Sequence, residues 1–217
     1  MIITKQKEKS EILKYVEGED KIFIFGCGEC ATVCKTGGEK EVAEMKRFLE
    51  SNGKTVTGFV IPDAPCIASQ VRTALGKNKQ AVKEADSIVI MACGLGAQSL
   101  KENLREPKPV HLVCDTLFMG EVDKKGAFLE RCSACGDCIL ELTGGICPVT
   151  RCPKGMVNGP CGGVDKGKCE VDKTLDCAWV LIYNELKNRG KLHLLEAYNP
   201  PKDHSKMLKP RMRSLEK

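Results

Sequence analysis

The chain has 217 residues, enough for one sizeable domain and a smaller appended one, and 42% of them are hydrophobic. Its formal net charge is +5, and residues 202–217 alone hold six basic and two acidic side chains. The rest is therefore close to neutral, which argues against a nucleic-acid-binding domain. The first twenty residues lack the apolar run of a secretion signal, and no stretch is apolar enough to span a bilayer, so we expect a cytoplasmic protein.

Strands and helices are predicted to alternate through the first half of the chain. Short continuous apolar runs predict buried strands at 21–25, 56–61, 87–92 and 109–113. Helical spacing predicts helices at 8–16, 39–53, 66–75, 79–85 and 94–104. Continuous apolar strands that alternate with helices are typical of a parallel sheet covered on both faces. We therefore predict an α/β fold, with a small doubly wound parallel-sheet domain over residues 1–120.

Fourteen cysteines are the most unusual feature of the composition. In a cytoplasmic protein, clustered cysteines more often bind metals or carry redox chemistry than form disulfides. Six of them follow the carboxyl ends of predicted strands, the edge where open parallel sheets bind ligands. These are Cys27, Cys30, Cys34, Cys66, Cys93 and Cys114. A cysteine there can also be a small buried hydrophobe. We favour that interpretation for Cys114, leave both open for Cys34 and Cys66, and take all but Cys114 as candidate metal ligands.

Other motifs in this half carry less information. Gly94-Leu-Gly96 follows a predicted strand but lacks the third glycine of a dinucleotide fingerprint, so we interpret it as a turn. The three histidines are scattered, and His111 lies within a predicted strand. We identify no catalytic residue and no pocket for an organic cofactor in this chain.

Residues 121–190 form a second, cysteine-rich module. Its eight cysteines match two four-cysteine sites: Cys132, Cys135, Cys138, Cys147, Cys152, Cys161, Cys169 and Cys177. A helix is predicted at 176–187, with Trp179, Ile182, Tyr183 and Leu186 on one apolar face. Residues 191–217 contain three prolines and little periodicity, and we predict an extended basic tail that docks on a partner.

The spacing of the first three cysteines in this module favours iron–sulfur over zinc. Three thiols at two-residue gaps followed by a remote Cys-Pro are typical of a [4Fe–4S] site. Cys132, Cys135 and Cys138 fit that run, although Cys147-Pro148 comes later than in bacterial ferredoxins. For the later cysteines zinc remains an alternative, and the assignment of individual ligands to sites stays open.

Two long segments of the module, GGICPVTRCPKGMVNGPCGG and KCEVDKTLDCAWVLIYNELK, resemble the methylenetetrahydrofolate reductase C-terminal-type domain. FGCGECATVCKTGGE and MACGLGAQ resemble the N-terminal half of the same small protein, so the resemblance spans about residues 20–190. The chain thus resembles the small iron–sulfur subunit of the two-subunit methylenetetrahydrofolate reductase of acetogenic bacteria.

This resemblance implies two or more [4Fe–4S] clusters, with zinc as a further possibility. It implies electron transfer to a flavin (FMN) held only by a large partner subunit. That subunit would reduce 5,10-methylene- to 5-methyltetrahydrofolate in the acetyl-CoA pathway. The electrons would come from ferredoxin or an accessory electron-transfer module.

Two other functions remain alternatives. The chain could be a zinc-stapled structural or assembly subunit of the same complex or of a methyl-transfer complex, and its cysteine-bearing sheet edge would then be inert. A corrinoid or methyl-transfer accessory protein is less well supported, because the sequence has neither the longer domain nor the histidine-bearing signature that so large a cofactor usually requires.

Overall fold

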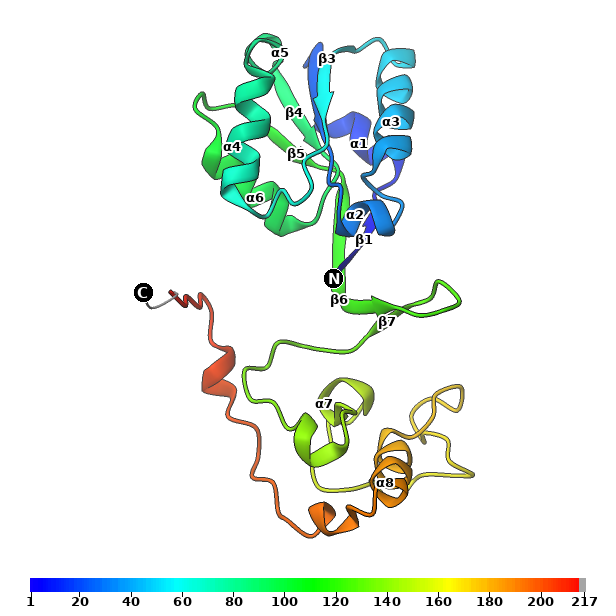
Figure 1. Ribbon diagram of the computed structural model, residues 1–217. Helices are drawn as coiled ribbons and strands as arrows, with labels where there is room; N and C mark the ends of the chain where they lie inside the picture. The colour runs from blue at the N-terminus through cyan, green and yellow to red at the C-terminus, as the bar shows by residue number, and fades with distance from the viewer. Residues whose placement is uncertain (215–217) are drawn as a thin grey trace. The chain divides into compact units, whose positions relative to one another are not determined.

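The computed structural model describes residues 1–214, and the last three residues of the predicted basic tail lie outside the described residues. The chain divides into two compact units, Met1–Phe118 and Met119–Lys217 (Figure 1). In the described part, no helix is both long enough and apolar enough to cross a membrane.

The first unit alternates strands and helices along most of its length. Its elements are β1 (Ile2–Gln6), α1 (Lys9–Tyr15), β2 (Lys21–Phe25), α2 (Cys30–Val33), α3 (Glu39–Ser51), β3 (Thr55–Val60), α4 (Ala68–Lys77), α5 (Lys79–Glu84), β4 (Ser87–Ile90), α6 (Gly94–Asn103), β5 (Val110–Leu112) and the start of β6 (Cys114–Val122).

A four-stranded parallel sheet in the order β3-β2-β4-β5 forms the centre of this unit. In the register of the sheet, Ile24 of β2 lies between Phe59 of β3 and Val89 of β4. The prediction of an α/β fold with a parallel sheet is therefore confirmed.

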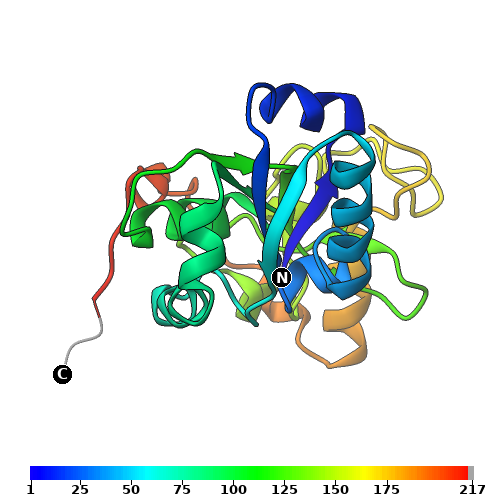
Figure 2. The ribbon, with the colours of Figure 1, turned by 90° about the horizontal axis from the view of Figure 1, so that it is seen from above.

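Each face of the sheet packs against its own helices. Alternate residues of β2 point to opposite faces, as the pleat requires, so Ile24 joins the cluster with α1 and α3 while Phe23 joins the cluster with α4 and α6. Figure 2 shows α3 on one side of the strands and the helices that follow β3 on the other. Both residues are completely buried, which explains why the strand reads as a continuous apolar run.

The structure contains elements that the sequence patterns did not predict. The short strand β1 and helix α2 were missed, and so was the hairpin of β6 and β7 (Phe128–Glu130). These strands form a separate three-stranded sheet in the order β1-β6-β7. β1 was missed because its burial depends on a strand more than a hundred residues away, and no local pattern reports that pairing.

The second unit has little regular structure. After β7 it contains η1 (Leu140–Thr143), α7 (Pro148–Arg151), α8 (Ala178–Asn188), η2 (Leu192–Leu195) and η3 (His204–Met207). The predicted helix at 176–187 is thus present as α8. Trp179, Ile182 and Leu186 lie on its buried face and form a hydrophobic cluster of this unit. The prediction was wrong for Tyr183, which is exposed because it lies at the edge of that face.

Gly37 tests how tightly the cysteine-bearing edge of the sheet is packed. A side-chain carbon at Gly37 would overlap the backbone carbonyl oxygen of Met91, which cannot move aside without disturbing the end of β4. We expect Gly37→Ala to lower the free energy of unfolding by at least about 2 kcal/mol, measured by urea denaturation. Gly76→Ala is the matched control, because nothing lies within 4 Å of the added carbon. It should be neutral or stabilise α4 by about 0.5–1 kcal/mol. Equal losses in both variants would contradict the packing argument.

Candidate metal centres

The strand order brings two predicted ligands to one point of the sheet edge. From β2 the chain runs outward to β3, crosses back to β4 and continues to β5, so the direction of winding reverses between β2 and β4. In open α/β sheets the crevice beyond the carboxyl ends of two such strands is the usual ligand site. Cys27 follows β2 and Cys93 follows β4, and both are buried, with 6% and 9% of their surface exposed.

Further thiols gather at the same edge. The Ile2 amide donates a hydrogen bond to the Cys30 sulfur at 3.4 Å, and the Cys34 thiol donates to the Ile2 carbonyl oxygen at 3.8 Å. The backbone of β1 thus contacts both cysteines, one at each end of α2. The Cys27 thiol donates to the carbonyl oxygen of Asp63 at 3.8 Å.

The electrostatics of Cys27 show that these thiols are neighbours. Burial raises the pKa of the Cys27 thiol, and the nearby thiols of Cys30 and Cys93 push it in the same direction, against backbone hydrogen bonds that lower it. A thiol held in its protonated form by burial is a good ligand only when a cation offsets the cost of ionisation. Cys27, Cys30 and Cys93 therefore form the compact part of the candidate site, with Cys34 beside it.

Two cysteines of this half stand apart. Cys66 is exposed in the segment between β3 and α4. Cys114 is completely buried at the start of β6, where its thiol donates to the carbonyl oxygen of Thr36 at 3.7 Å. Burial raises the pKa of Cys114 to about 12, and Asp115, Cys34 and Cys93 add to the rise. The structure therefore agrees with the interpretation of Cys114 as a small buried hydrophobe.

In the second unit, the first three cysteines lie on one tightly turned loop. Ala134 and Gly136 both have left-handed backbone conformations, with φ of 53° and 78°. The Ala134 amide donates to the Cys132 sulfur at 3.3 Å, and the Cys135 thiol donates to the carbonyl oxygen of Asp137 at 3.7 Å. Cys138 is exposed at the end of this loop. Backbone amides directed at sulfur are what an iron–sulfur ligand loop needs, because they offset the negative charge of the thiolates.

The basic tail packs on this loop. Asp137 forms ion pairs with Lys202 at 3.4 Å and Lys206 at 3.0 Å, and the guanidinium of Arg211 donates to the Ala134 carbonyl oxygen at 2.9 Å. The Lys206 ammonium lowers the pKa of the Asp137 carboxyl, and Lys202 adds to the effect. Three basic residues of the predicted tail thus have partners within their own unit, and docking of the tail on another protein stays a prediction.

The last four cysteines of the module line one small cavity. Its volume is about 20 Å³, and its walls include Cys152, Cys161, Cys169 and Cys177 together with Trp179. Backbone hydrogen bonds from Cys169 to Leu175 and from Cys177 to Gly167 fold residues 165–177 back on themselves. This fold brings thiols separated by 25 positions in the sequence to a common space. Cys147, by contrast, lies at the N-terminal end of α7 and does not line the cavity.

A charged pair accompanies these thiols. Lys154 and Glu170 line the same cavity and form an ion pair with each other. The pKa of the Cys161 thiol is lowered by the backbone amide of Gly163 and, to a smaller extent, by Lys154. The cavity therefore combines four thiols with a cation that favours the ionised form of one of them, Cys161.

The thiol groups do not stand at bonding distance from a common point. Among residues 1–214, no three Cys, His, Asp or Glu side chains are close enough to enclose a single metal ion. The structure thus shows which cysteines share an edge, a loop or a cavity, and ligation by any of them remains a prediction.

The sequence patterns missed residues that support these groups. Thr36 is buried next to the sheet edge, where its hydroxyl lies 2.6 Å from that of Thr4 and its carbonyl oxygen accepts from Gln6 at 3.0 Å. The Trp179 indole donates to the Met156 carbonyl oxygen at 2.9 Å and places the ring against the four-thiol cavity. The Thr-Gly-Gly run after Cys34 was the available signal for Thr36, since two glycines beside a polar residue indicate close packing.

Fold and site together define a cysteine-rich protein with a parallel α/β unit and a second unit built around clustered thiols. Residues 112–205 match the family described as "Methylene-tetrahydrofolate reductase C terminal". The resemblance expected from the sequence is confirmed for this segment, which is under half of the chain and lies mostly in the second unit. Residues 20–111, where a resemblance was also expected, lie outside the match. Neither the curated proteins nor the solved structures yielded a match.

The buried state of Cys114 predicts low reactivity. With a pKa of about 12 against an ordinary 9.0, its thiolate fraction at pH 8 is about 1,000-fold below that of an ordinary thiol. We expect Cys114 to resist iodoacetamide in the folded protein while the exposed Cys66 is alkylated, as read by peptide mass spectrometry. In 8 M urea the two should react at similar rates. Equal labelling in the folded protein would show that Cys114 is accessible.

The contact between tail and loop predicts a change in protease sensitivity. Asp137→Asn removes the carboxylate shared by Lys202 and Lys206, so the tail should detach more often. We expect trypsin to cleave after Lys206 several-fold faster, with little change in overall stability because exposed ion pairs contribute little. Asp172→Asn is the control, since Asp172 accepts hydrogen bonds only within its own turn, from Thr174. Unchanged cleavage in Asp137→Asn would mean that these ion pairs do not hold the tail.

Proposed function

We propose that this chain is an electron-transfer subunit that carries [4Fe–4S] clusters and supplies electrons to the flavin of a methylenetetrahydrofolate reductase. The observation that carries the proposal is the gathering of eleven of the thirteen candidate cysteines into three groups, with Cys66 and Cys147 outside them. One lies on the sheet edge, one on the loop from Cys132 and one around the four-thiol cavity. The family match over residues 112–205 supports association with the reductase.

The partner in this proposal is a large subunit that holds FMN and the folate. Ferredoxin or an accessory electron-transfer module would donate the electrons. We place the complex in the cytoplasm, where thiols stay reduced and available to metals.

Two of the groups fit iron–sulfur clusters. At the sheet edge, Cys27, Cys30 and Cys93 would be ligands, with Cys34 or Cys66 as the fourth. In the second unit Cys132, Cys135 and Cys138 would bind with Cys147, the one remaining cysteine of the module. Bound clusters would supply one-electron storage and transfer. The two groups differ in exposure to solvent, because Cys27 and Cys93 are buried whereas Cys132 and Cys138 are exposed.

The four-thiol cavity fits a smaller occupant. A space of about 20 Å³ is only slightly larger than one water molecule needs. Four thiolates around a single ion are the common closed arrangement of structural zinc. We therefore propose that Cys152, Cys161, Cys169 and Cys177 bind zinc, which would link residues 152–177 to α8.

A structural subunit remains the second candidate function, and one observation favours it. Among the described residues of the second unit, the cluster of buried hydrophobic side chains consists of Trp179, Ile182 and Leu186, with partly buried residues packed against it. So small a core stabilises about 100 residues poorly, and bound metal would substitute for it. In this alternative all metal is zinc, and the chain stabilises or assembles its partner without carrying electrons.

The two functions differ in metal content and in the effect of one substitution. Anaerobically purified protein should contain about eight iron atoms, matching acid-labile sulfide and one zinc per chain, and should show an EPR signal on reduction. In the complex with the large subunit, Cys135→Ser should lower electron delivery from ferredoxin at least tenfold. The flavin subunit should keep its reaction with an artificial flavin reductant.

Ser133→Ala, on the same loop, is the matched control and should leave iron content and electron delivery unchanged. Colourless protein that contains only zinc would contradict the electron-transfer function. Loss of both reactions together in Cys135→Ser would favour the structural subunit, because the module would then unfold without its metal.

A further inference from the structure

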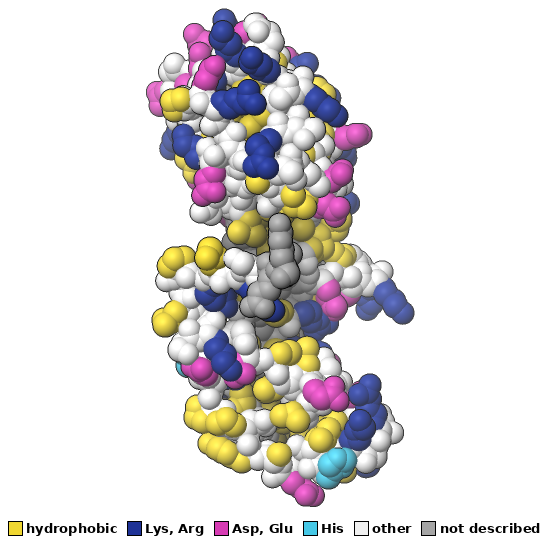
Figure 3. All heavy atoms as spheres, turned by 60° about the vertical axis from the view of Figure 1, so that its left-hand side comes forward, with side chains coloured by type: hydrophobic (Ala, Val, Ile, Leu, Met, Phe, Trp, Pro, Cys, Tyr) yellow, Lys and Arg dark blue, Asp and Glu magenta, His cyan; other side chains and the backbone are white. Residues whose placement is uncertain are grey.

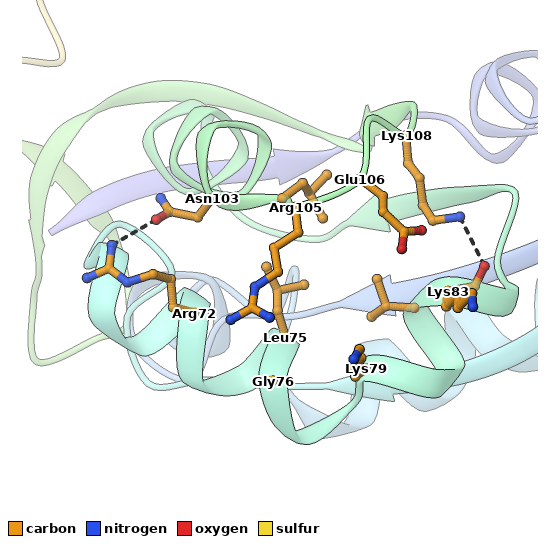
Figure 4. A pocket seen from close by; sticks show the side chains of 11 residues that line it. Arg72, Leu75, Gly76, Lys79, Lys83, Asn103, Arg105, Glu106 and Lys108 are labelled. Atoms are coloured by element: carbon orange, nitrogen blue, oxygen red, sulfur yellow. Dashed lines mark hydrogen bonds between the residues drawn. The ribbon is translucent and has the colours of Figure 1, made fainter.

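A pocket in the first unit lies outside every thiol group. Its volume is about 170 Å³, and it is lined by the C-terminal half of α4, by α5, by Asn103 at the end of α6 and by residues 104–108 (Figure 4). No cysteine lines it.

The topology places this pocket at the opposite edge of the sheet from the cysteines. α4 and α6 begin near the carboxyl ends of strands β3 and β4, and both end at the other edge, where the chain turns back into α5 and β5. Cys27 and Cys93 follow strand ends, whereas the pocket lies where helices end. Its occupant would therefore be distinct from the metals of the proposed function.

The lining combines an apolar surface with many cations. Leu75, Val82 and Leu104 are half-buried and supply the apolar part. The charged side chains comprise one acid and five bases: Glu106, Arg72, Lys79, Lys83, Arg105 and Lys108. An excess of four positive charges around one small space contrasts with the rest of this unit, and it favours an anion.

Two of the bases are held in place by hydrogen bonds. The Arg72 guanidinium donates to the Asn103 side chain at 3.0 Å, and the Lys108 ammonium donates to the backbone oxygens of Lys83 at 3.2 Å and Ala85 at 2.5 Å. In Figure 4, Arg105 reaches from the segment after α6 toward α4. Across residues 1–214, no salt bridge involves any charged side chain of the pocket. None of the five cations is therefore paired directly with a described carboxylate, and Glu106 is the one acid in the lining.

Helix ends account for only one of the five bases, Lys83 on the last turn of α5. Basic residues are favoured near helix C-termini, which explains lysines such as Lys77 and Lys101 on the last turns of α4 and α6. Arg105 and Lys108 lie beyond α6, and Lys79 starts α5, where a cation is disfavoured. Their position around one apolar surface needs another explanation.

We propose that this pocket binds a small organic anion that carries one ring-sized apolar group and a carboxylate or phosphate. A cavity of about 150 Å³ is known to accommodate benzene, so 170 Å³ has room for one ring against Leu75, Val82 and Leu104. Arg72 and Arg105 provide planar guanidinium groups, which bind carboxylate and phosphate oxygens in pairs.

Three simple probes separate the contributions of ring and charge. Phenyl phosphate has both, inorganic phosphate has only the charge, and benzyl alcohol has only the ring. Titration of the full anaerobically purified chain, followed by calorimetry, should give binding of phenyl phosphate at least tenfold tighter than that of either other probe. Benzoate replaces phosphate in a fourth arm and distinguishes the two anionic groups. Raising the salt concentration should weaken the phenyl phosphate complex, because the cations are exposed.

Substitutions in the pocket test whether phenyl phosphate binds there. Arg105→Gln should weaken phenyl phosphate binding about tenfold, since a hydrogen bond to a charged group contributes about 1.4 kcal/mol or more. Lys40→Gln removes the same charge from the start of α3, away from the pocket, and should have no effect. Leu104→Gln should reduce the affinity for phenyl phosphate to that for inorganic phosphate. Unfolding curves check that each variant is folded, and the exposed Arg105 provides the test if Leu104→Gln is unstable.

Three outcomes would overturn the proposal. Phenyl phosphate could bind no better than inorganic phosphate, or equally well to Arg105→Gln and the parent chain. An acidic peptide with a single phenylalanine could bind more tightly than phenyl phosphate and lose that affinity in Arg105→Gln, which would identify a docking site for a protein segment instead. Loss of iron from the chain affects none of these readouts, so the proposed function can fail while this one stands.

Discussion

The central position of β2 in the parallel sheet determines most of what the first unit can do. Because β3 and β4 flank it with parallel register, the segments that follow β2 and β4 must emerge side by side at the same edge. Cys27 and Cys93 lie in those segments. The pairing of the strand backbones thus brings these two thiols together without any direct attraction between the cysteines. The backbone of β1 adds contacts to Cys30 and Cys34.

The second unit differs from the first because it has little apolar surface to bury and so gains little stability from a hydrophobic core. Its buried hydrophobic cluster lies on one face of α8, while eight cysteines are distributed over its loops. Figure 3 shows that further hydrophobic side chains gather on the surface of this unit. The unit loses conformational entropy where its backbone is fixed, at the left-handed turns of Ala134 and Gly136 and in the folded-back segment 165–177. Burial of so small a core does not offset this cost in free energy. Thiolate–metal bonds are the natural compensation, which is why the metal content of this unit decides between the two candidate functions.

Basic side chains have different surroundings in the two units. In the second unit, bases of the tail neutralise Asp137 on a ligand loop, so part of the net positive charge is satisfied internally. In the first unit, five bases and a single acid, Glu106, line an apolar pocket. The same residue types therefore stabilise local structure in one place and leave an unsatisfied positive field in the other. Composition alone, which records only a net charge of +5, does not distinguish these roles.

The sequence by itself determined the parallel α/β fold, because buried strands such as 21–25 and helices such as 39–51 have local apolar patterns that need no knowledge of distant residues. Its fourteen cysteines led to the prediction of thiol chemistry, and the long motifs of the second unit carried the family resemblance. Only the tertiary structure decided that β1 pairs with β6, that Cys114 is buried against Thr36, and that Cys152 shares a cavity with Cys177 while Cys147 does not. Each of these depends on contacts between residues far apart in the chain, and spacing along the sequence does not report distance in space.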